Sequence, residues 1–424
     1  MNLWRANIYL VGIGGIGMSA LAQLLAHRGA RVGGSDREES PVTMMLAEKG
    51  IAVSIGHDSC SIPAHCELLI YSDAVPSENL ERARAREMGI PELSYFEALG
   101  EISAGVRTIA VAGTHGKTTT TGMLAKILQR ADKKPTAIVG SIVRDFNANF
   151  LAGKDDLFVI EACEYRDHLL KLSPEILVIT NIELDHTDYF PDLAALKETF
   201  RTAALRVPEH GFIVTDPHDP VIAEVVRGVS ARVVDFTHEK VPELGLIGEF
   251  NRGNARAAKA AARAAYSDIS LGSIDDALAQ FKGSWRRFEY KGETPGGAIV
   301  FDDYAHHPTA VRKTIEAARE KFPSKKIVVA FHPHLFSRTK SFLPEFAAAL
   351  ATADKAIVAP IYAAREAPDP SVSNHVLASE AGGNVIALDS FDAIRDELLK
   401  EDSGSLIITM GAGDIYKVAE QIAD

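Results

Sequence analysis

The sequence predicts an α/β protein of three domains, each built around a mainly parallel sheet. Short apolar runs of strand length alternate with helical stretches of roughly 10–15 residues, the pattern of repeated strand–helix–strand units. The length of 424 residues corresponds to two or three domains at about 150 residues each. The strand series restarts after Gly100–Gly105 and again after Trp285–Glu289. We therefore expect domains at residues 1–102, 103–286 and 287–424.

The first series supplies a short sheet and its covering helices. We expect strands at Ile8–Val11, Ala30–Gly33, Ile51–Ile55 and Leu68–Tyr71, and helices at Met18–His27 and Asn79–Met88. The second series is expected to contain strands at 106–112, 157–161, 176–180 and 211–215 and helices at 255–266 and 274–281. The third is expected to contain strands at 298–301, 326–331, 355–360, 385–388 and 405–410 and helices at 309–321 and 391–400.

The composition of the chain limits the classes of function and of partner that it can have. With 45 Lys+Arg against 57 Asp+Glu the net charge is −12, which argues against nucleic acid as a partner. Three cysteines cannot form a disulfide framework in a chain of this length and favour a reducing compartment. The uncharged stretch from Ala6 to Ala26 imitates a signal peptide, but its four glycines divide it into a strand and a helix. We expect a cytoplasmic protein with no membrane partner, either a monomer or a homodimer.

A glycine-rich turn follows the first expected strand and opens the first expected helix. Such a turn brings backbone N–H groups close to a diphosphate at the positive end of the helix. An acid at the end of the next strand can bind a ribose hydroxyl. A ligand with a diphosphate and a ribose, either a dinucleotide or a nucleotide sugar, is therefore expected here, and a turn without ligand is the alternative. The expected contacts are Gly12, Gly14, Gly15, Gly17, Ser35 and Asp36.

A second loop follows the strand expected at 106–112 and has the character of a phosphate-binding loop. A strict P-loop has glycine six positions before the lysine, where this chain has Val111, so the loop is a shortened variant. Its N–H groups can still cradle phosphates, Lys117 can reach the β/γ oxygens and the Thr118 hydroxyl can bind Mg²⁺. We expect ATP or GTP to bind this loop, whose residues are Gly113, Thr114, His115, Gly116, Lys117, Thr118 and Thr119.

Acidic and imidazole groups follow two further strands of the middle domain. Glu161 ends one strand, and His186 lies in the polar run after another. Because open α/β sheets bind ligands at the carboxyl ends of their strands, both should face the P-loop. We expect them to hold a second divalent ion near the γ-phosphate, with solvated loop acids as the alternative.

Polar motifs also mark strand ends and the junction of the third domain. Two histidine pairs occur there, but their spacing differs from structural zinc sites. Cys163 in the middle domain is flanked by Glu164, which should raise the thiol pKa and argues against a nucleophile. The motifs are Trp285-Arg-Arg-Phe-Glu289, Asp302-Asp-Tyr-Ala-His-His-Pro-Thr309, His332-Pro-His-Leu-Phe-Ser-Arg-Thr339 and Gly411-Ala-Gly-Asp-Ile415.

Taken in order from about Ile8 to Ile422, these motifs resemble the Mur ligase family. The resemblance implies a Rossmann-like N-terminal domain for a UDP-sugar, a central P-loop ATPase-like domain and a Rossmann-like C-terminal domain that closes over the site. It implies an enzyme that uses ATP and Mg²⁺ to convert the lactyl carboxylate of UDP-N-acetylmuramate to an acyl phosphate. The resemblance further implies that the amine of L-alanine then attacks this acyl phosphate, as a step in cytoplasmic peptidoglycan precursor synthesis. The most specific motifs are Gly113–Thr120, Asn181–His186, Arg286–Glu289, Asp302–Thr309 and Gly411–Ile415.

The resemblance also implies roles for single residues. Lys117 would hold the γ-phosphate, Thr118 one Mg²⁺, and Glu161 with His186 a second Mg²⁺. Matches to adenine contacts are Asn251 and Asn254, matches to nucleotide contacts from the third domain are Arg287 and Asp303, and matches near the incoming amino acid are His306 and Arg338. An arginine there can pair with the amino-acid carboxylate.

Four positions bear on the branch of the family. Phe250 stands where His usually precedes Asn251, Cys163 where the alanine-adding branch usually has Asp, and Leu335 where many members have a second arginine. Arg201 replaces the lysine that later-acting members carbamylate, in agreement with the alanine-adding branch. The alternatives are a recycling ligase that uses a preformed tripeptide, a folate-type relative, a non-catalytic nucleotide-sugar-binding regulator and a nicotinamide dehydrogenase.

Overall fold

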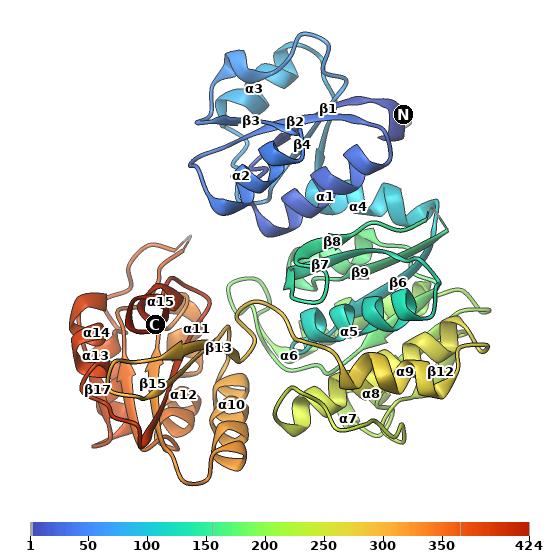
Figure 1. Ribbon diagram of the computed structural model, residues 1–424. Helices are drawn as coiled ribbons and strands as arrows, with labels where there is room; N and C mark the ends of the chain where they lie inside the picture. Colours follow the sequence, from blue (N-terminus) through green and yellow to red (C-terminus); the bar gives the residue numbers. More distant parts are fainter. Residues whose placement is uncertain (1–2, 155, 365, 424) are drawn as a thin grey trace.

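The computed structural model describes residues 3–154, 156–364 and 366–423, and its strands form three sheets (Figure 1). Each sheet takes its strands from one stretch of chain, at residues 7–94, 107–235 and 289–410. We refer to these parts as the first, central and third units. The three α/β units confirm the expected fold class, and the domain limits at 102 and 286 stay a prediction.

The first unit has a five-stranded parallel sheet in the order β3-β2-β1-β4-β5. Its strands are β1 (Asn7–Val11), β2 (Arg31–Asp36), β3 (Ala52–Ile55), β4 (Leu68–Tyr71) and β5 (Glu92–Ser94). Its helices are η1 (Leu3–Arg5), α1 (Ile16–His27), α2 (Pro41–Glu48), η2 (Ser59–Ser61), α3 (Leu80–Glu87) and α4 (Tyr95–Ala104). Strand β2 runs three residues beyond its expected end, through two glycines. A Cβ at Gly34 would lie 2.2 Å from the Leu10 carbonyl oxygen, so glycine allows the strand to pass.

The central unit has a seven-stranded sheet in the order β12-β11-β10-β6-β9-β7-β8, parallel except for β7 with β8. Its strands are β6 (Arg107–Ala112), β7 (Thr136–Val143), β8 (Ala148–Leu151), β9 (Leu157–Glu161), β10 (Ile176–Ile179), β11 (Phe212–Thr215) and β12 (Arg232–Asp235). Its helices are α5 (Lys117–Arg130), η3 (Tyr165–Lys171), α6 (Leu193–Arg206), α7 (Pro220–Val225), α8 (Glu249–Ala265) and α9 (Leu271–Ala279).

The third unit has a six-stranded sheet in the order β13-β14-β18-β15-β16-β17, in which β13 with β14 is antiparallel. Its strands are β13 (Glu289–Glu293), β14 (Ile299–Asp303), β15 (Lys326–Phe331), β16 (Lys355–Val358), β17 (Val385–Ala387) and β18 (Ser405–Met410). Its helices are α10 (Pro308–Lys321), α11 (Phe336–Ser341), α12 (Leu343–Leu350), α13 (Asn374–Ala381), α14 (Phe391–Leu398) and α15 (Tyr416–Ile422).

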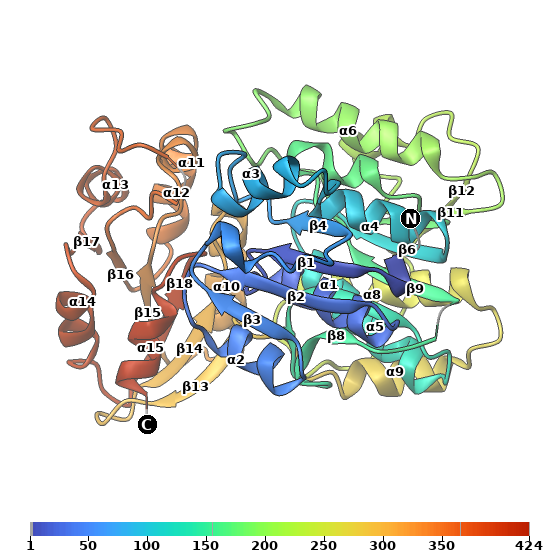
Figure 2. The same cartoon turned by 90° about the horizontal axis from the view of Figure 1, so that it is seen from above.

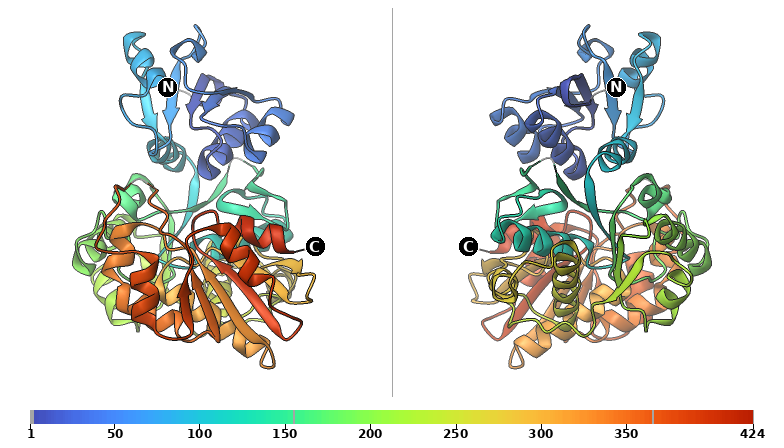
Figure 3. Two further views of the ribbon diagram at one scale, coloured as in Figure 1. Left: turned by 90° about the vertical axis from the view of Figure 1, so that its left-hand side faces the viewer. Right: turned by 90° about the vertical axis from the view of Figure 1, so that its right-hand side faces the viewer.

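The first unit stands on the central unit, and the third lies beside the central one (Figures 2 and 3). Helix α1 of the first unit packs against β7 and β8 of the central sheet, and α4 packs against η3 and β6 (Figure 1). Among the described residues, no helix is both long and apolar enough to cross a membrane.

The expected strands all occur, with limits within about three residues of those expected. Five strands were not foreseen, namely β5, β7, β8, β12 and β13. Strand β12 lies at a sheet edge and is partly exposed, and β13 carries charges along its length, whereas β7 and β8 are mostly buried. Helix α8 begins at Glu249, well before the expected start at Ala255, because packing against α5 extends it through a stretch of weak helix formers.

Candidate active site

The glycine loop after β6 leads directly into a helix. Gly113 and Gly116 have φ of +127° and +85°, and α5 begins at the next residue, Lys117. A Cβ at Gly113 would lie 2.1 Å from Thr180 Oγ1, and one at Gly116 would lie 2.2 Å from Asn254 Oδ1. Both positions therefore require glycine for conformation and for space. The loop ends at a helix N-terminus, where unpaired N–H groups favour an anion.

Lys117 is held over this loop by an acid that sequence analysis did not assign. Its Nζ donates to the carbonyls of Gly113 at 2.5 Å and Thr114 at 3.2 Å, and lies 3.0 Å from both oxygens of Glu164. Burial by itself would lower the pKa of Lys117, but the charge of Glu164 outweighs this and raises it. Burial would raise the pKa of Glu164, and Lys117 outweighs that in turn and lowers it. Both groups are therefore ionised at neutral pH.

Thr118, Glu161 and Arg287 meet at the start of α5. Thr118 Oγ1 donates to Glu161 Oε1 at 3.0 Å, and Arg287 Nη2 of the third unit donates to the same hydroxyl at 3.1 Å. Glu161 Oε2 accepts from the N–H of Gly140 at 2.7 Å. The third unit thus places a guanidinium against the first turn of the P-loop helix, and the contact of Arg287 with a nucleotide stays a prediction.

The oxygen donors at this point fit a magnesium ion. Mg²⁺ prefers carboxylate and hydroxyl oxygens, which Glu161 and Thr118 provide side by side. His186 comes to the same region indirectly, with Nε2 3.6 Å from Glu164 Oε1. Its Nδ1 and the Nε of Arg287 are buried without a hydrogen-bond partner. Buried polar atoms of this kind ordinarily have partners, so their grouping here indicates a place shaped for a polar ligand.

Helix α8 brings its two asparagines to the P-loop. Asn251 Nδ2 donates to the Ile247 carbonyl at 2.8 Å, and Asn254 Nδ2 donates to Asn251 Oδ1 at 3.3 Å. Both side chains are buried, and that of Asn254 lies against Gly116. Phe250, where family members have histidine, lies beside Gly248 at the start of the same helix. The asparagines are therefore placed next to the expected nucleotide.

The loop after β14 is ordered by Asp303. Its carboxylate accepts from the N–H groups of Phe288 and Ala305, both at 2.7 Å. Burial raises the pKa of Asp303 to about 6, against the attraction of Arg287. The neighbouring His306 has its Nδ1 2.8 Å from the Tyr304 carbonyl oxygen. Burial, with repulsion from Arg338, holds the pKa of His306 well below its usual range, so the ring is neutral.

Arg338 already has a carboxylate partner inside the protein. Its Nε and Nη2 both lie 2.8 Å from Asp185 Oδ1 of the central unit, and its Nη1 lies 3.0 Å from His334 Nδ1. The two charged side chains are almost fully buried. Arg338 outweighs the effect of burial and holds the pKa of Asp185 well below its usual range. Its expected contact with an amino-acid carboxylate stays a prediction, because Asp185 occupies this face of the guanidinium.

In the glycine turn of the first unit, most backbone N–H groups already donate to acceptors within the protein. The N–H groups of Gly12 and Ile13 donate to the Ser35 carbonyl at 2.8 and 2.9 Å, and that of Gly14 donates to Asp36 Oδ2 at 2.8 Å. A Cβ at Gly17 would lie 2.7 Å from the Tyr95 ring. Asp36 therefore fixes the turn, and the first turn of α1 is the part that offers N–H groups to a phosphate.

Ser35 lies away from that turn's surface. Its hydroxyl is buried and donates to Glu81 Oε2 at 2.7 Å, in a network that also includes Tyr9 and His57. The side chain of Ser35 is thus committed to the interior, and a substrate contact would have to use another atom of this residue.

The structure shows what surrounds Cys163 and Leu335, two positions at which the sequence departs from the expected motifs. Burial, helped by Glu164, raises the pKa of Cys163 to about 12, which supports the expectation that this thiol is not a nucleophile. Leu335 is buried and adopts φ of +69°, with its N–H donating to the Tyr362 carbonyl at 2.9 Å.

Glu164, Glu183, Asp185 and Thr309 lie within the sequence motifs but had no predicted role in the site. In the structure, Glu164 binds Lys117, the Glu183 carbonyl binds Thr114 of the P-loop, and Asp185 binds Arg338. Thr309 of the third unit binds Glu183 of the central unit. The sequence signal for these residues was that they are polar and lie close to residues with an assigned role. Which polar residues face into the site depends on the fold.

A P-loop lysine, an adjacent carboxylate and an arginine from a separate unit define an enzyme that transfers a phosphoryl group from a nucleoside triphosphate. Three family models match along the chain: "Mur ligase family, catalytic domain" at residues 7–107, "Mur ligase middle domain" at 111–243 and "Mur ligase, glutamate ligase domain" at 286–413. The chain belongs to the Mur ligase family and is an ATP-dependent ligase.

Relatives match over nearly the full length. The UDP-N-acetylmuramate–L-alanine ligase of Caldicellulosiruptor saccharolyticus is 38% identical, covering 99% of this chain and 98% of its own. That of Clostridium novyi is 37% identical, covering 99% and 97%. The crystal structure of the same type of ligase from Thermotoga maritima has a TM-score of 0.80 at 26% identity, covering 99% and 98%. A murein peptide ligase from Psychrobacter arcticus shares the fold, with a TM-score of 0.72 at 22% identity and coverage of 99% and 100%.

Proposed function

We propose that this chain joins L-alanine to the lactyl carboxylate of UDP-N-acetylmuramate, with conversion of ATP to ADP and phosphate, in peptidoglycan precursor synthesis. The chemistry rests on the convergence of Lys117, Thr118, Glu161 and Arg287 at one helix N-terminus. The choice of substrates rests on relatives of that activity that are 35–38% identical over the whole chain.

In the first step, a carboxylate oxygen of the sugar nucleotide attacks the γ-phosphorus and the bond to the β-phosphate oxygen breaks, giving an acyl phosphate and ADP. Lys117 and Arg287 neutralise charge as the phosphoryl group moves. Thr118 would hold one Mg²⁺ and Glu161 with His186 a second, and these cations would supply further positive charge to neutralise the phosphates. Glu164 keeps the lysine ionised and directed along the loop before ATP arrives.

In the second step, the amine of L-alanine attacks the acyl carbon, and the tetrahedral intermediate collapses to the amide and phosphate. The attacking amine must lose a proton. His306 is neutral, and with Nδ1 engaged by the Tyr304 carbonyl its Nε2 carries the lone pair. We assign His306 as the group that accepts a hydrogen bond from the amine. Arg338 lies next to this ring and completes the amino-acid side of the site.

The decisive experiment measures phosphate release from ATP and Mg²⁺ with UDP-N-acetylmuramate, adding L-alanine, glycine, L-serine or a tripeptide separately. We expect release with L-alanine and formation of UDP-N-acetylmuramoyl-L-alanine. Release with the tripeptide alone would assign the recycling reaction instead, and silence with every acceptor would contradict the proposal.

A variant of the P-loop tests the assigned chemistry. Lys117→Ala should lower turnover by about two to three orders of magnitude, since a preorganised charge at the transferring phosphoryl group contributes on the order of 3–4 kcal/mol. Near-normal turnover in this variant would contradict the role of Lys117.

A further inference from the structure

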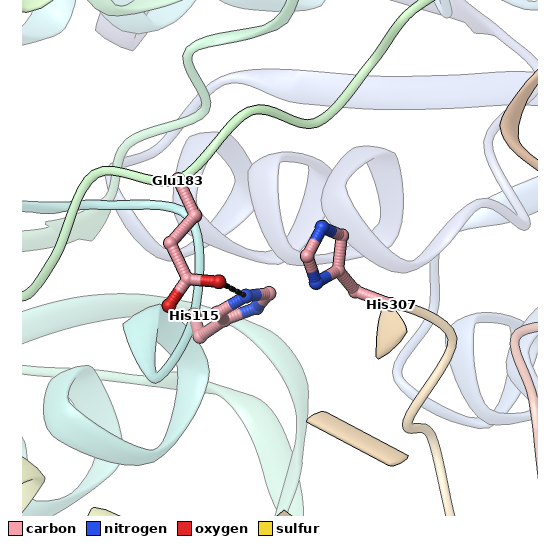
Figure 4. A group of neighbouring side chains, drawn as sticks. All are labelled: His115, Glu183 and His307. Atoms are coloured by element: carbon pink, nitrogen blue, oxygen red, sulfur yellow. Dashed lines mark ion pairs between the residues drawn. The ribbon is translucent and has the colours of Figure 1, made fainter. Parts of the chain in front are cut away.

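Three metal-ligating side chains meet where the central and third units touch, apart from the expected magnesium site. His115 lies in the P-loop, Glu183 follows β10 and His307 precedes α10. One ligand atom of each lies within 4.8 Å of the others. His115 Nε2 is 3.5 Å from Glu183 Oε2, and the rings of His115 and His307 have centroids 4.8 Å apart. Figure 4 shows the His115 ring between the Glu183 carboxylate and the His307 ring.

Two of the three side chains are oriented by neighbours. His307 Nε2 lies 3.1 Å from the Leu184 carbonyl oxygen, so this nitrogen carries the proton and Nδ1 carries the lone pair. A metal-binding histidine typically donates its other N–H to a carbonyl in this way. Glu183 Oε2 accepts from Thr309 Oγ1 at 2.7 Å, which fixes the carboxylate. His307 Nδ1 also accepts a long hydrogen bond of 3.3 Å from the N–H of Thr309 at the start of α10, and a cation bound to Nδ1 would replace this bond.

The remaining ligand has no partner of its own. His115 Nε2 is buried and makes no hydrogen bond, and its distance to Glu183 is too long for one. The Glu183 carboxylate and the His307 ring thus lie beside a buried nitrogen of His115 that has no partner.

We propose that His115, Glu183 and His307 bind a divalent transition cation of the Zn²⁺ class, which bridges the P-loop and the third unit. Two imidazoles and one carboxylate form the ligand set of open zinc sites, with the fourth position left to water or another oxygen. The nitrogen donors select against Mg²⁺, which prefers oxygen, and so separate this site chemically from Thr118 and Glu161. A cation there would favour contact between the units because its ligands come from both.

A second cluster on the central unit provides the comparison. His218, Asp235 and His238 also place three ligand atoms together, but the histidine side chains are 71% and 83% exposed. These residues lie within one unit and bridge nothing. His218 and His238 therefore have to be replaced before metal binding is measured, because this cluster can bind the same metals.

The test is a Co²⁺ titration of the full chain in excess Mg²⁺, followed by visible absorption, in a His218→Ala/His238→Ala background. We expect one Co²⁺ per chain with the spectrum of a nitrogen-ligated site. Glu183→Gln and His307→Gln, made separately in that background, should each weaken binding at least tenfold. His375→Ala, which removes an exposed histidine paired with Asp389, should leave it unchanged.

Two outcomes would overturn the proposal: the absence of nitrogen-ligated Co²⁺ in the background variant, or affinity that neither Glu183→Gln nor His307→Gln alters. The first would mean that these groups act only as a hydrogen-bonded contact between the units. Zinc anomalous scattering from crystals of the full chain would locate the ion directly. The measurements need neither substrate nor turnover, so they stand or fall independently of the proposed ligase reaction.

Discussion

The central unit meets its two neighbours in different ways. Toward the first unit, one continuous apolar core runs from Leu21 and Leu99 across to Phe158 and Leu177. Within this contact, Asn149 donates to the Ile16 carbonyl at 2.6 Å and to Ser19 Oγ at 3.0 Å. Charged pairs such as Lys171 with Glu97 lie at the exposed margin. This contact has the character of a domain interior.

The contact with the third unit is built from polar and charged groups. Arg338 with Asp185, Arg287 with Thr118, and Thr309 with Glu183 all join the two units through side chains. The apolar cores of the third unit contain only its own residues among those described.

The difference indicates which contact can open. Separating the first unit would expose apolar surface, at about 25 cal/mol per Å². Separating the third unit exposes ions and hydrogen-bonding groups that water can solvate again. We therefore expect the first and central units to behave as one body and the third to close and open over the P-loop.

The largest effect is expected from Arg338→Ala. Asp185 would be left buried and unpaired, and opening of the third unit is the way to rehydrate it. Turnover should fall about a thousandfold, or roughly 4 kcal/mol, while the radius of gyration from X-ray scattering increases. Arg319→Ala, which breaks an exposed pair with Asp354 inside the third unit, is the control. An unchanged radius of gyration would show that this pair does not hold the units together.

Acid should open the same contact. Burial lowers the pKa of His307 to about 4, whereas the hydrated ring titrates near 6.5. Because the open form binds the proton more readily, closure is fully favoured above about pH 6.5 and weakens as the pH falls toward 4. The total loss is about 3 kcal/mol. Scattering or energy transfer between labelled units should show opening in this range, and His307→Gln should flatten the dependence. Separation of the first unit over the same range would contradict the comparison.

A smaller effect is expected at the apolar contact. Asn149→Ala leaves the Ile16 carbonyl and the Ser19 hydroxyl without this donor and should cost about 2 kcal/mol. Thermal unfolding should shift downward by several degrees, with no increase in the radius of gyration before unfolding. A rise in the radius of gyration at temperatures where the chain is still folded would mean that this contact also opens.

The smallest effect is expected from Thr309→Val. The shape is kept, but the hydrogen bond to Glu183 is lost, at a cost of about 1 kcal/mol. Turnover should fall about fivefold, with the thermal midpoint almost unchanged. Thr202→Val, on the exposed face of α6, removes a comparable hydroxyl away from the contact and should have no effect. Equal losses in both variants would argue against a specific role for Thr309.

Much of the fold could be predicted because buried parallel strands are apolar along their length. The runs at β4, β15 and β18 are buried along all or nearly all of their length and were located within a residue. Edge strands such as β12 and β13 were missed because partial exposure removes that signal. Their pairing with a neighbouring strand, rather than their composition, makes them strands.

Some residues of the candidate site could be assigned from the sequence and others could not, for a similar reason. Lys117, Thr118 and Glu161 follow from local patterns, since glycines and strand ends fix where the backbone places them. Asp185 and Glu164 could not be assigned, because their partners Arg338 and Lys117 lie 153 and 47 residues away in the chain.

By itself, the sequence determined three α/β units, a phosphate-binding loop and the residue types that a phosphoryl-transfer site needs. These are local properties, set by the periodicity of apolar residues and by the conformational freedom of glycine. Only the tertiary structure decided that Arg338 faces Asp185, that Ser35 turns inward and that His115 meets His307. Such pairings depend on how the units pack, because burial makes the choice of partner matter and burial is set by the whole fold.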